Sequence, residues 1–235
     1  MRQSRYLRAE ILNDETLDPF LEGKIKVIQS KRGYRFSVDA LLLARFVTVR
    51  EKEIVVDLGT GCGIIPLIIN SEKVRPAYTI GVEIQWDLAY QAMRNMRING
   101  FGDSTGIVQA DLRQIPLKSH FAHCIICNPP YRRAKSGRIN PDLQKAIARH
   151  EILVSLEDII KVAGYLLRPK GRIAMIYRAD RLIDMIYLMR RYSFEPKRLQ
   201  LIYSGPQREC RLFLIESVYM GRPQLTILPP ILNSK

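Results

Sequence analysis

A glycine-rich turn between two short apolar segments limits the folds open to this chain more than any other stretch. A strand is expected over residues 53–56, the turn at 57–63 has the sequence Asp-Leu-Gly-Thr-Gly-Cys-Gly, and an apolar helix is expected over 64–69. Glycines permit a tight turn from strand to helix and let a ligand approach the backbone, with the N–H groups of the helix start nearby. The pattern therefore predicts an α/β unit that holds an extended cofactor.

The residue types of the turn indicate which cofactor it holds. Gly59, Gly61 and Gly63 have the spacing G-x-G-x-G, whereas dinucleotide sites have G-x-G-x-x-G. Asp57 precedes the first glycine, and a carboxylate there would repel a diphosphate and attract an ammonium group. The turn therefore favours S-adenosylmethionine, whose methionine part carries an ammonium group.

Polar side chains follow three further expected strands, at the point where each strand ends. These strands are expected over residues 78–82, 107–110 and 122–127. Glu83 follows the first strand, Asp111 the second and Asn128 the third. Open α/β sheets bind ligands beyond the carboxyl ends of their strands. A carboxylate at Glu83 can accept hydrogen bonds from both hydroxyls of a ribose, and Asp111 suits the exocyclic amine of an adenine.

The tetrapeptide Asn128-Pro129-Pro130-Tyr131 begins at the last of these strand ends. Its two prolines fix φ and remove two backbone donors, so the carbonyl groups stay free to accept hydrogen bonds. The Asn128 side chain adds an amide oxygen, and Tyr131 adds an aromatic face on which a planar group can stack. Such a site suits a planar group with an exocyclic NH2, and a plain proline turn is the alternative.

Together, in this order and spacing, these motifs resemble the class I S-adenosylmethionine-dependent amino methyltransferases over residues 30–180. The segments 36–40 (FSVDA), 221–223 (GRP) and 228–230 (LPP) are similar, more narrowly, to the bacterial tRNA adenine-N6 methyltransferases that act beside the anticodon of a valine tRNA, at position 37. The resemblance implies a Rossmann-like α/β fold. Its sheet would be seven-stranded and mostly parallel, with an antiparallel last strand pair and a small N-terminal hairpin before it.

The resemblance also implies a role for each site residue. It assigns to the cofactor site Tyr34, Phe36, Asp57, Gly59, Gly61, Gly63, Glu83, Ile84, Asp111, Leu112 and Asn128. Catalysis would rest on Asn128 and the carbonyl of Pro129, which bind the two N–H groups of the target amine, while Tyr131 stacks on the base. An aryl amine is a poor nucleophile because its lone pair is delocalised. Two acceptors on its hydrogens return electron density to the nitrogen and aim the lone pair, so no strong base is needed.

A net charge of +14 favours a polyanionic partner, nucleic acid before membrane. Residues 131–149 contain six basic residues and one acid. Beside the catalytic tetrapeptide, such a loop can bind phosphates while the target base is flipped out of its stack. We therefore expect tRNA contacts at Arg132, Arg133, Lys135 and Arg138, with a merely solvated loop as the alternative.

The remainder of the chain completes a single domain over residues 1–235. Residues 1–50 are interpreted as an arm, hairpin and helix, 51–220 as the catalytic core and 221–235 as an extended tail. The arm over 1–24 is expected to be irregular, the hairpin to contain a strand over 24–29 with its turn at 30–33, and Ser37 to cap the next helix. Further elements are expected at 86–99, 151–167 and 181–191 as helices, at 169–171 as a turn, and at 172–177, 198–203 and 211–218 as strands.

The cysteines and the hydropathy pattern indicate neither a metal site nor a membrane protein. Cys124 and Cys127 form a C-x-x-C motif, but residues three apart on a strand point to opposite faces, so both are interpreted as buried hydrophobic side chains. No apolar run reaches the ~18 residues of a membrane span, and residues 1–10 do not resemble a signal peptide. We expect a cytoplasmic protein without a metal, and a monomer.

Three other functions use parts of the same pattern. Enzymes that methylate a glutamine side chain in release factors share the tetrapeptide, but they carry a longer N-terminal region for their protein substrate. Guanine-N2 methyltransferases of ribosomal RNA usually have phenylalanine where this chain has Tyr131. An RNA-binding module with an inactive cofactor site would have no use for Asp57, Glu83, Asp111 and Asn128 together.

Overall fold

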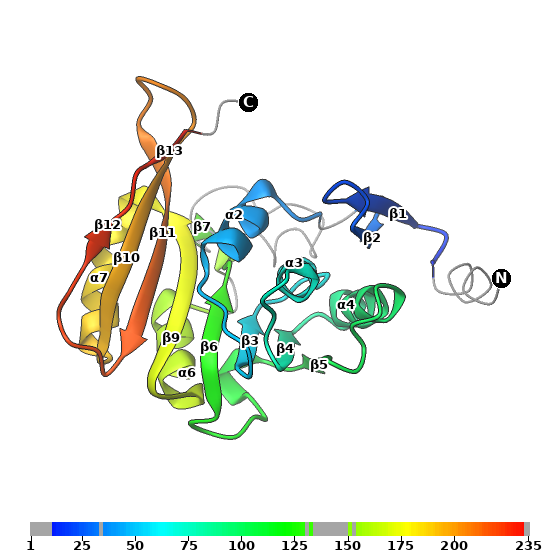
Figure 1. Cartoon of the computed structure of the whole chain (residues 1–235), viewed down its shortest axis with the longest axis horizontal. Coiled ribbons are helices and arrows are strands. Elements are labelled where there is room, and N and C mark those ends of the chain that lie inside the picture. Colours follow the sequence, from blue (N-terminus) through cyan, green and yellow to red (C-terminus); the bar gives the residue numbers. More distant parts are fainter. Residues whose placement is uncertain (1–10, 33–34, 130–131, 134–149, 152–153, 233–235) are drawn as a thin grey trace.

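The computed structural model describes residues 11–32, 35–129, 132–133, 150–151 and 154–232 (Figure 1). In chain order, its strands, α-helices and 3₁₀-helices (η) are β1 (Glu15–Phe20), β2 (Ile25–Ser30), α2 (Val38–Phe46), β3 (Ile54–Leu58), α3 (Ile64–Ser71), β4 (Tyr78–Glu83), α4 (Trp86–Ile98), β5 (Thr105–Gln109), η1 (Leu112–Gln114), β6 (Ala122–Cys127), β7 (Arg132–Arg133), β8 (His150–Glu151), α6 (Leu156–Leu166), β9 (Leu167–Arg178), η2 (Ala179–Arg181), α7 (Leu182–Arg191), β10 (Phe194–Tyr203), β11 (Cys210–Tyr219), β12 (Thr226–Ile227) and β13 (Ile231–Leu232).

A sheet of nine strands forms the body of the described structure. Its strands lie in the order β12-β10-β11-β9-β6-β3-β4-β5, and β13 also pairs with β10. The strands β5, β4, β3, β6 and β9 run parallel, and β11 runs antiparallel to both of its neighbours. This confirms the predicted seven-stranded, mostly parallel sheet with an antiparallel last pair. The tail, which was expected to be extended, adds β12 and β13 as short parallel strands along β10.

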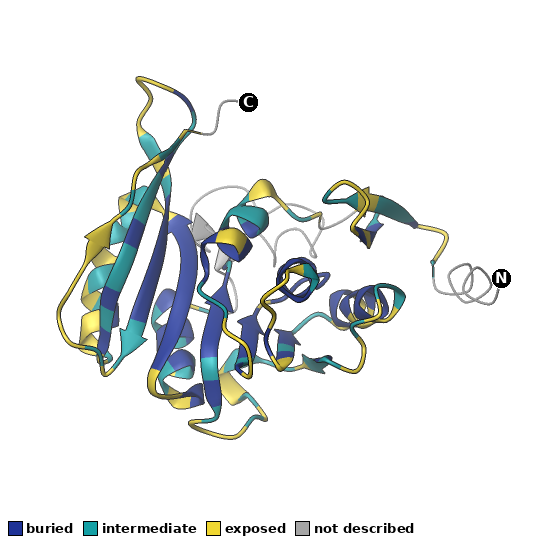
Figure 2. Cartoon of the chain, in the orientation of Figure 1, coloured by how far each residue is buried: buried dark blue, intermediate teal, exposed yellow. Residues whose placement is uncertain are grey.

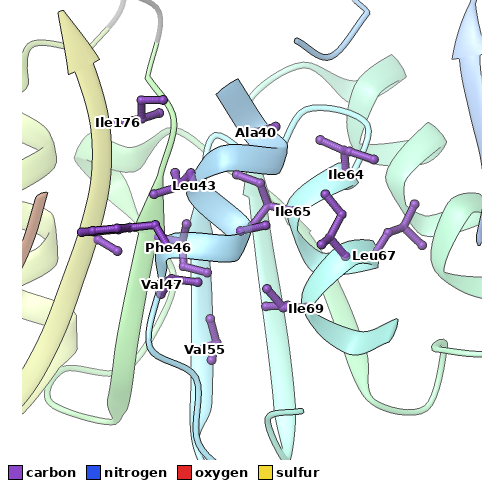
Figure 3. Close-up of a cluster of buried hydrophobic side chains, with 14 of the residues drawn as sticks. Ala40, Leu43, Phe46, Val47, Val55, Ile64, Ile65, Leu67, Ile69 and Ile176 are labelled. Atoms are coloured by element: carbon purple, nitrogen blue, oxygen red, sulfur yellow. The ribbon is translucent and has the colours of Figure 1, made fainter. Parts of the chain in front are cut away.

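Helices cover both faces of this sheet, and each face has its own apolar cluster. On one face α2, α3 and α4 contribute to a cluster that contains Val55 of β3 (Figure 3). On the other face α6 and α7 pack over a cluster that contains Val56, the next residue of the same strand. Successive side chains of a strand point to opposite faces, so the central strands are buried on both sides (Figure 2). Polar site residues such as Glu83 and Asn128 therefore lie at the ends of these strands.

The cysteines of β6 follow the same alternation. Cys124 belongs to the cluster on the α2 face and Cys127 to the cluster on the α6 face, which confirms that they point in opposite directions. Both are buried free thiols. Burial raises the pKa of the Cys124 thiol to about 12, as expected for a side chain that acts as a small hydrophobic group.

The N-terminal hairpin turns at a different place from the one predicted. β1 and β2 pair in antiparallel register along their whole length, so the connecting turn lies at residues 21–24 and not at 30–33. β1 also occupies residues that were expected to be irregular. The turn uses left-handed backbone at Leu21 and Glu22, with φ of 51° and 56°, where glycine is the usual sequence signal. The hairpin itself is present as predicted.

Polar side chains of α4 hold this hairpin against the body of the domain. Arg94 donates two hydrogen bonds to the Glu15 carboxylate, with Nη2–Oε1 at 2.5 Å and Nη1–Oε2 at 2.6 Å, and both side chains are buried. Asn95 accepts from the Ile28 N–H at 2.6 Å and donates to the Ile28 carbonyl at 3.0 Å. Its amide also donates to the Cys62 carbonyl at 2.9 Å. Asn95 therefore joins the hairpin directly to the glycine turn.

Three local predictions need correction. Ser37 precedes α2, but its side chain makes no capping hydrogen bond. α6 begins at Leu156, later than expected, because Ser155 and Asp158 form a reciprocal capping box there. The turn expected at 169–171 lies within β9 as an irregularity in its pairing with β6, so the strand begins earlier than predicted.

Candidate active site

The polar residues predicted for the site lie at one edge of the sheet, across four neighbouring strands. Asp57 is in β3, Glu83 is the last residue of β4, Asp111 follows β5 and Asn128 follows β6. These strands are adjacent in the order β6-β3-β4-β5, and their register puts the carboxyl ends side by side. The structure therefore brings together the four positions that the sequence marks, at the edge where open α/β sheets bind ligands.

The glycine turn leaves one position open to a ligand and uses another for packing. Gly59, Gly61 and Gly63 have positive φ of 74°, 57° and 82°, a conformation that favours glycine. A Cβ at Gly63 would lie 3.1 Å from Cβ and 3.3 Å from the backbone Cα of Ala92, so this glycine is needed for the contact with α4. A Cβ at Gly59 would meet no atom within 4 Å, and the residue is exposed. The backbone at Gly59 can therefore be approached closely.

Asp57 is a buried carboxyl with unused acceptor capacity. Its Oδ2 accepts a hydrogen bond from the Thr60 hydroxyl at 2.7 Å, and its Oδ1 is buried without a hydrogen-bond partner in the structure as described. Burial raises the pKa of this carboxyl to about 7, against the lowering effect of the Thr60 hydrogen bond, and the nearby Glu83 raises it further. A cationic group beside Oδ1 would favour the ionised form.

Glu83 connects the glycine turn to the turn before α4. Its Oε2 accepts the Gly61 N–H at 2.9 Å and its Oε1 accepts the Gln85 N–H at 3.0 Å. Burial raises the pKa of Glu83, and these backbone hydrogen bonds oppose the rise. The Ile84 backbone N–H also acts on this carboxylate. A carboxylate has about four lone-pair positions, so acceptor capacity remains for a ligand hydroxyl.

Asp111 has a partner that sequence reasoning missed. The Arg113 guanidinium donates to Asp111 from Nε at 3.0 Å and from Nη2 at 2.5 Å, and the Arg113 backbone N–H donates to Oδ1 at 2.9 Å. The Arg113 side-chain hydrogen bond is the main reason that the pKa of Asp111 lies below its ordinary value. The signal available in the sequence was the spacing Asp-x-Arg at the start of η1. Arg113 holds the Asp111 carboxylate ionised and in one orientation.

Apolar residues flank these acids. Ile84 and Leu112 are half-buried and each directly follows one of the carboxylates, Glu83 or Asp111. Phe36 is half-buried and contacts Phe20 of β1 edge to face, with ring centroids 5.0 Å apart. The hairpin therefore supports an aromatic residue that the resemblance assigns to the cofactor site.

Part of the predicted catalytic tetrapeptide is described. Asn128 is half-buried and Pro129 is buried, directly after β6. Arg132 and Arg133 form the short strand β7, which pairs in parallel with β8, but their side chains lie outside the described part of the chain. Four predicted site residues lie outside it altogether: Tyr34, Tyr131, Lys135 and Arg138. The roles predicted for them remain predictions.

Two other kinds of feature are absent from the residues that the structure describes. No group of three or more His, Cys, Asp and Glu side chains in those residues is arranged to hold a metal ion. Within the same ranges, no helix combines the length and the apolar character needed to cross a membrane.

The strand order, the glycine turn and the acids at the strand ends define the fold of a class I S-adenosylmethionine-dependent methyltransferase. A solved structure with a similar fold is that of M. jannaschii TYW2 in complex with AdoMet, with a TM-score of 0.60, 13% sequence identity, and 88% of this chain and 86% of that chain covered. The chain belongs to the methyltransferase small domain family, whose model matches residues 36–191.

Two curated relatives share the name tRNA1(Val) (adenine(37)-N6)-methyltransferase. The one from Porphyromonas gingivalis is 34% identical over 164 residues, which are 68% of this chain and 63% of the relative. The one from Parabacteroides distasonis is 26% identical over 194 residues, which are 82% of this chain and 80% of the relative. The chain thus covers somewhat less than two thirds of the Porphyromonas relative.

Proposed function

We propose that this protein transfers a methyl group from S-adenosylmethionine to the N6 amine of an adenine in tRNA, next to the anticodon. The observation that carries the proposal is the place of Asn128 and Pro129, directly after β6 and beside the strand ends that bear Asp57, Glu83 and Asp111. The names of the two relatives support the substrate, and a net charge of +14 suits a polyanion. Such an enzyme would act in the cytoplasm, and we expect it to be a monomer.

The strand-end residues fit the cofactor group by group. Glu83 retains acceptor capacity that would bind the ribose hydroxyls. Asp57 has its free Oδ1 for the ammonium group, and Asp111, oriented by Arg113, can accept from the adenine amine. Bound here, S-adenosylmethionine supplies a methyl group on a positively charged sulfur. The open backbone at Gly59 leaves room for the extended ligand.

The acceptors of the tetrapeptide would bind the target amine. The Asn128 side-chain oxygen and the Pro129 carbonyl each accept one N–H of the exocyclic NH2 group. With both hydrogens engaged, electron density returns to the nitrogen and its lone pair is aimed in one direction. Tyr131 would stack on the base and hold it out of the RNA stack. The target amine becomes strongly acidic only as it is methylated, so no dedicated base is required.

Nucleoside analysis tests this proposal. The protein is incubated with labelled S-adenosylmethionine and total tRNA, and the RNA is digested to nucleosides. We expect label in N6-methyladenosine. Label in a methylguanosine would favour guanine-N2 methylation, and label in protein with unlabelled RNA would favour methylation of a glutamine side chain. Either result would overturn the proposal.

Substitution of Asn128 tests the role of the tetrapeptide. Asn128→Ala is expected to lower kcat by about 10²- to 10³-fold, as for the loss of one oriented hydrogen-bonding group, and to lower cofactor affinity much less. Asn13→Ala is a matched control, because Asn13 is an exposed residue ahead of β1. An Asn128→Ala variant with wild-type turnover would remove this side chain from the reaction.

A further inference from the structure

A hollow of about 830 Å³ lies between the start of α2 and the β10–β11 hairpin. Its polar lining consists of Ser37, Asp39, Tyr203, Ser204, Arg208 and Arg211. Ligand clefts in proteins span roughly 300–1,000 Å³, so this hollow can accept more than a single small ion. None of the strand-end residues of the candidate active site is part of its lining.

The hollow faces the same side of the molecule as the candidate active site. β10 runs parallel to β6 through the chain of pairings β10-β11-β9-β6, so Tyr203 ends β10 at the edge where Asn128 follows β6. β11 pairs with β9 as far as Arg178, whereas β6 reaches only as far as Met175. The hairpin therefore projects past the catalytic edge, and its exposed tip stands clear of the sheet in Figures 1 and 2.

The charged groups of the hollow are available for a ligand. Arg208 and Arg211 are exposed, and neither forms an ion pair or a side-chain hydrogen bond with the residues described. The lining contains one acid, Asp39, against these two cations. Ser37 adds a hydroxyl that α2 does not use as a cap. Two unpaired guanidinium groups with a nearby hydroxyl suit phosphate oxygens, because the planar guanidinium fork matches their geometry.

We propose that this hollow binds the sugar–phosphate backbone of the tRNA, with Arg208 and Arg211 on phosphates a few nucleotides to one side of the target adenine. This inference rests on the proposed function. Three strand spacings of roughly 4.8 Å separate β6 from β10, about 14 Å in all. A stacked strand advances about 3.4 Å per nucleotide, so the contacted phosphates lie about four nucleotides from the adenine at Asn128. The contact would fix the register of the RNA without reading its bases.

A salt titration of tRNA binding tests the inference. The double variant Arg208→Gln/Arg211→Gln is compared with Lys73→Gln/Arg75→Gln, which removes the same charge from exposed positions before β4, at the opposite edge of the sheet. Loss of two phosphate contacts should reduce the slope of log Kd against log salt concentration by about 1.5. We also expect KM for tRNA to rise on the order of tenfold with little change in kcat, and unchanged cofactor affinity. The control should retain the wild-type slope.

The possible outcomes separate this inference from the proposed function. If the wild-type protein methylates tRNA and the Arg208/Arg211 variant keeps the wild-type salt slope and KM, the proposal that the hollow binds RNA is overturned and the proposed function stands. If tRNA binding depends on Arg208 and Arg211 as expected but the wild-type protein transfers no methyl group to tRNA, the proposed function is overturned and RNA binding by the hollow stands. No tRNA binding by the wild type would overturn both.

Discussion

Replacement of Asp57 by asparagine keeps the shape of a buried side chain and removes its charge. Burial raises the pKa of Asp57 to about 7, from an ordinary value of 3.8. A carboxyl with a higher pKa in the folded protein binds its proton more tightly there, so stability that is present below pH 4 is lost as the pH rises toward 7. At pH 8 the wild-type protein without cofactor therefore holds an uncompensated buried charge that the variant lacks.

The pKa shift of Asp57 and its unpartnered Oδ1 determine how much the substitution changes the free energy of unfolding. A shift from 3.8 to about 7 corresponds to about 4 kcal/mol in favour of the neutral side chain at pH 8. Asparagine places an NH2 group where Oδ1 has no partner, and a buried donor without a partner costs about 1–3 kcal/mol. The free energy of unfolding should thus rise by about 1–3 kcal/mol at pH 8. Between pH 8 and pH 5 this advantage should shrink by about 3 kcal/mol, because the wild-type carboxyl becomes protonated.

Urea unfolding at pH 5 and pH 8, without cofactor, measures both values. Asp103→Asn is the matched control, since Asp103 is exposed and the same change of residue there should leave stability unaltered at either pH. Calorimetric titration with S-adenosylmethionine at pH 8 should show weaker binding to the Asp57 variant, if the carboxylate faces the ammonium group. The same stability difference at both pH values would refute the reasoning, because it would mean that no buried charge develops at Asp57.

Four further substitutions probe the surroundings of the site. Gly63→Ala should lower the free energy of unfolding by about 2–4 kcal/mol, because its Cβ would lie 3.1 Å from Cβ and 3.3 Å from the backbone Cα of Ala92 in α4, in addition to the strain of a positive φ. Gly59→Ala should cost only about 1 kcal/mol of backbone strain, and urea unfolding compares the two variants. Asn95→Ala should cost about 2–4 kcal/mol by the same measurement, since buried backbone groups of the hairpin and the glycine turn lose their partner. Arg113→Gln should leave stability nearly unchanged, because the pair is exposed, but it should weaken cofactor binding at acid pH, where the raised pKa lets Asp111 become protonated; titration calorimetry from pH 4 to 7 measures this binding.

Local sequence patterns were sufficient for the sheet and its polar edge. Short apolar runs, each ended by an acid or by Asn128, mark strands and their ends independently of the rest of the chain. Once those strands are parallel, their carboxyl ends meet at one edge, so the four polar positions come together without further information. Gly59 and Gly63 adopt a positive φ within a local turn, so their residue type alone indicated the turn.

The errors concern elements that depend on distant residues. β1 lacks an alternating pattern and contains Pro19, and it is held in place partly by Glu15, whose partner Arg94 lies 79 residues away. β12 and β13 are strands only because they pair with the edge of β10. The Asp111–Arg113 contact depends on how η1 turns after β5, which the residue types alone leave open. The late start of α6, by contrast, was marked in the sequence by the capping-box residues Ser155 and Asp158.

The distribution of the cysteines makes the native chain suitable for site-selective chemistry. Cys62, Cys124 and Cys127 are buried, and burial raises the pKa of each thiol, to about 12 for the first two. Cys210 is half-buried at the start of β11, beside the loop that connects β10 and β11, so a thiol reagent reaches it first. A fluorophore attached there, without any substitution, would report the arrival of RNA at the neighbouring hollow. The other three thiols react only when the core opens, and their rate of labelling would count those openings.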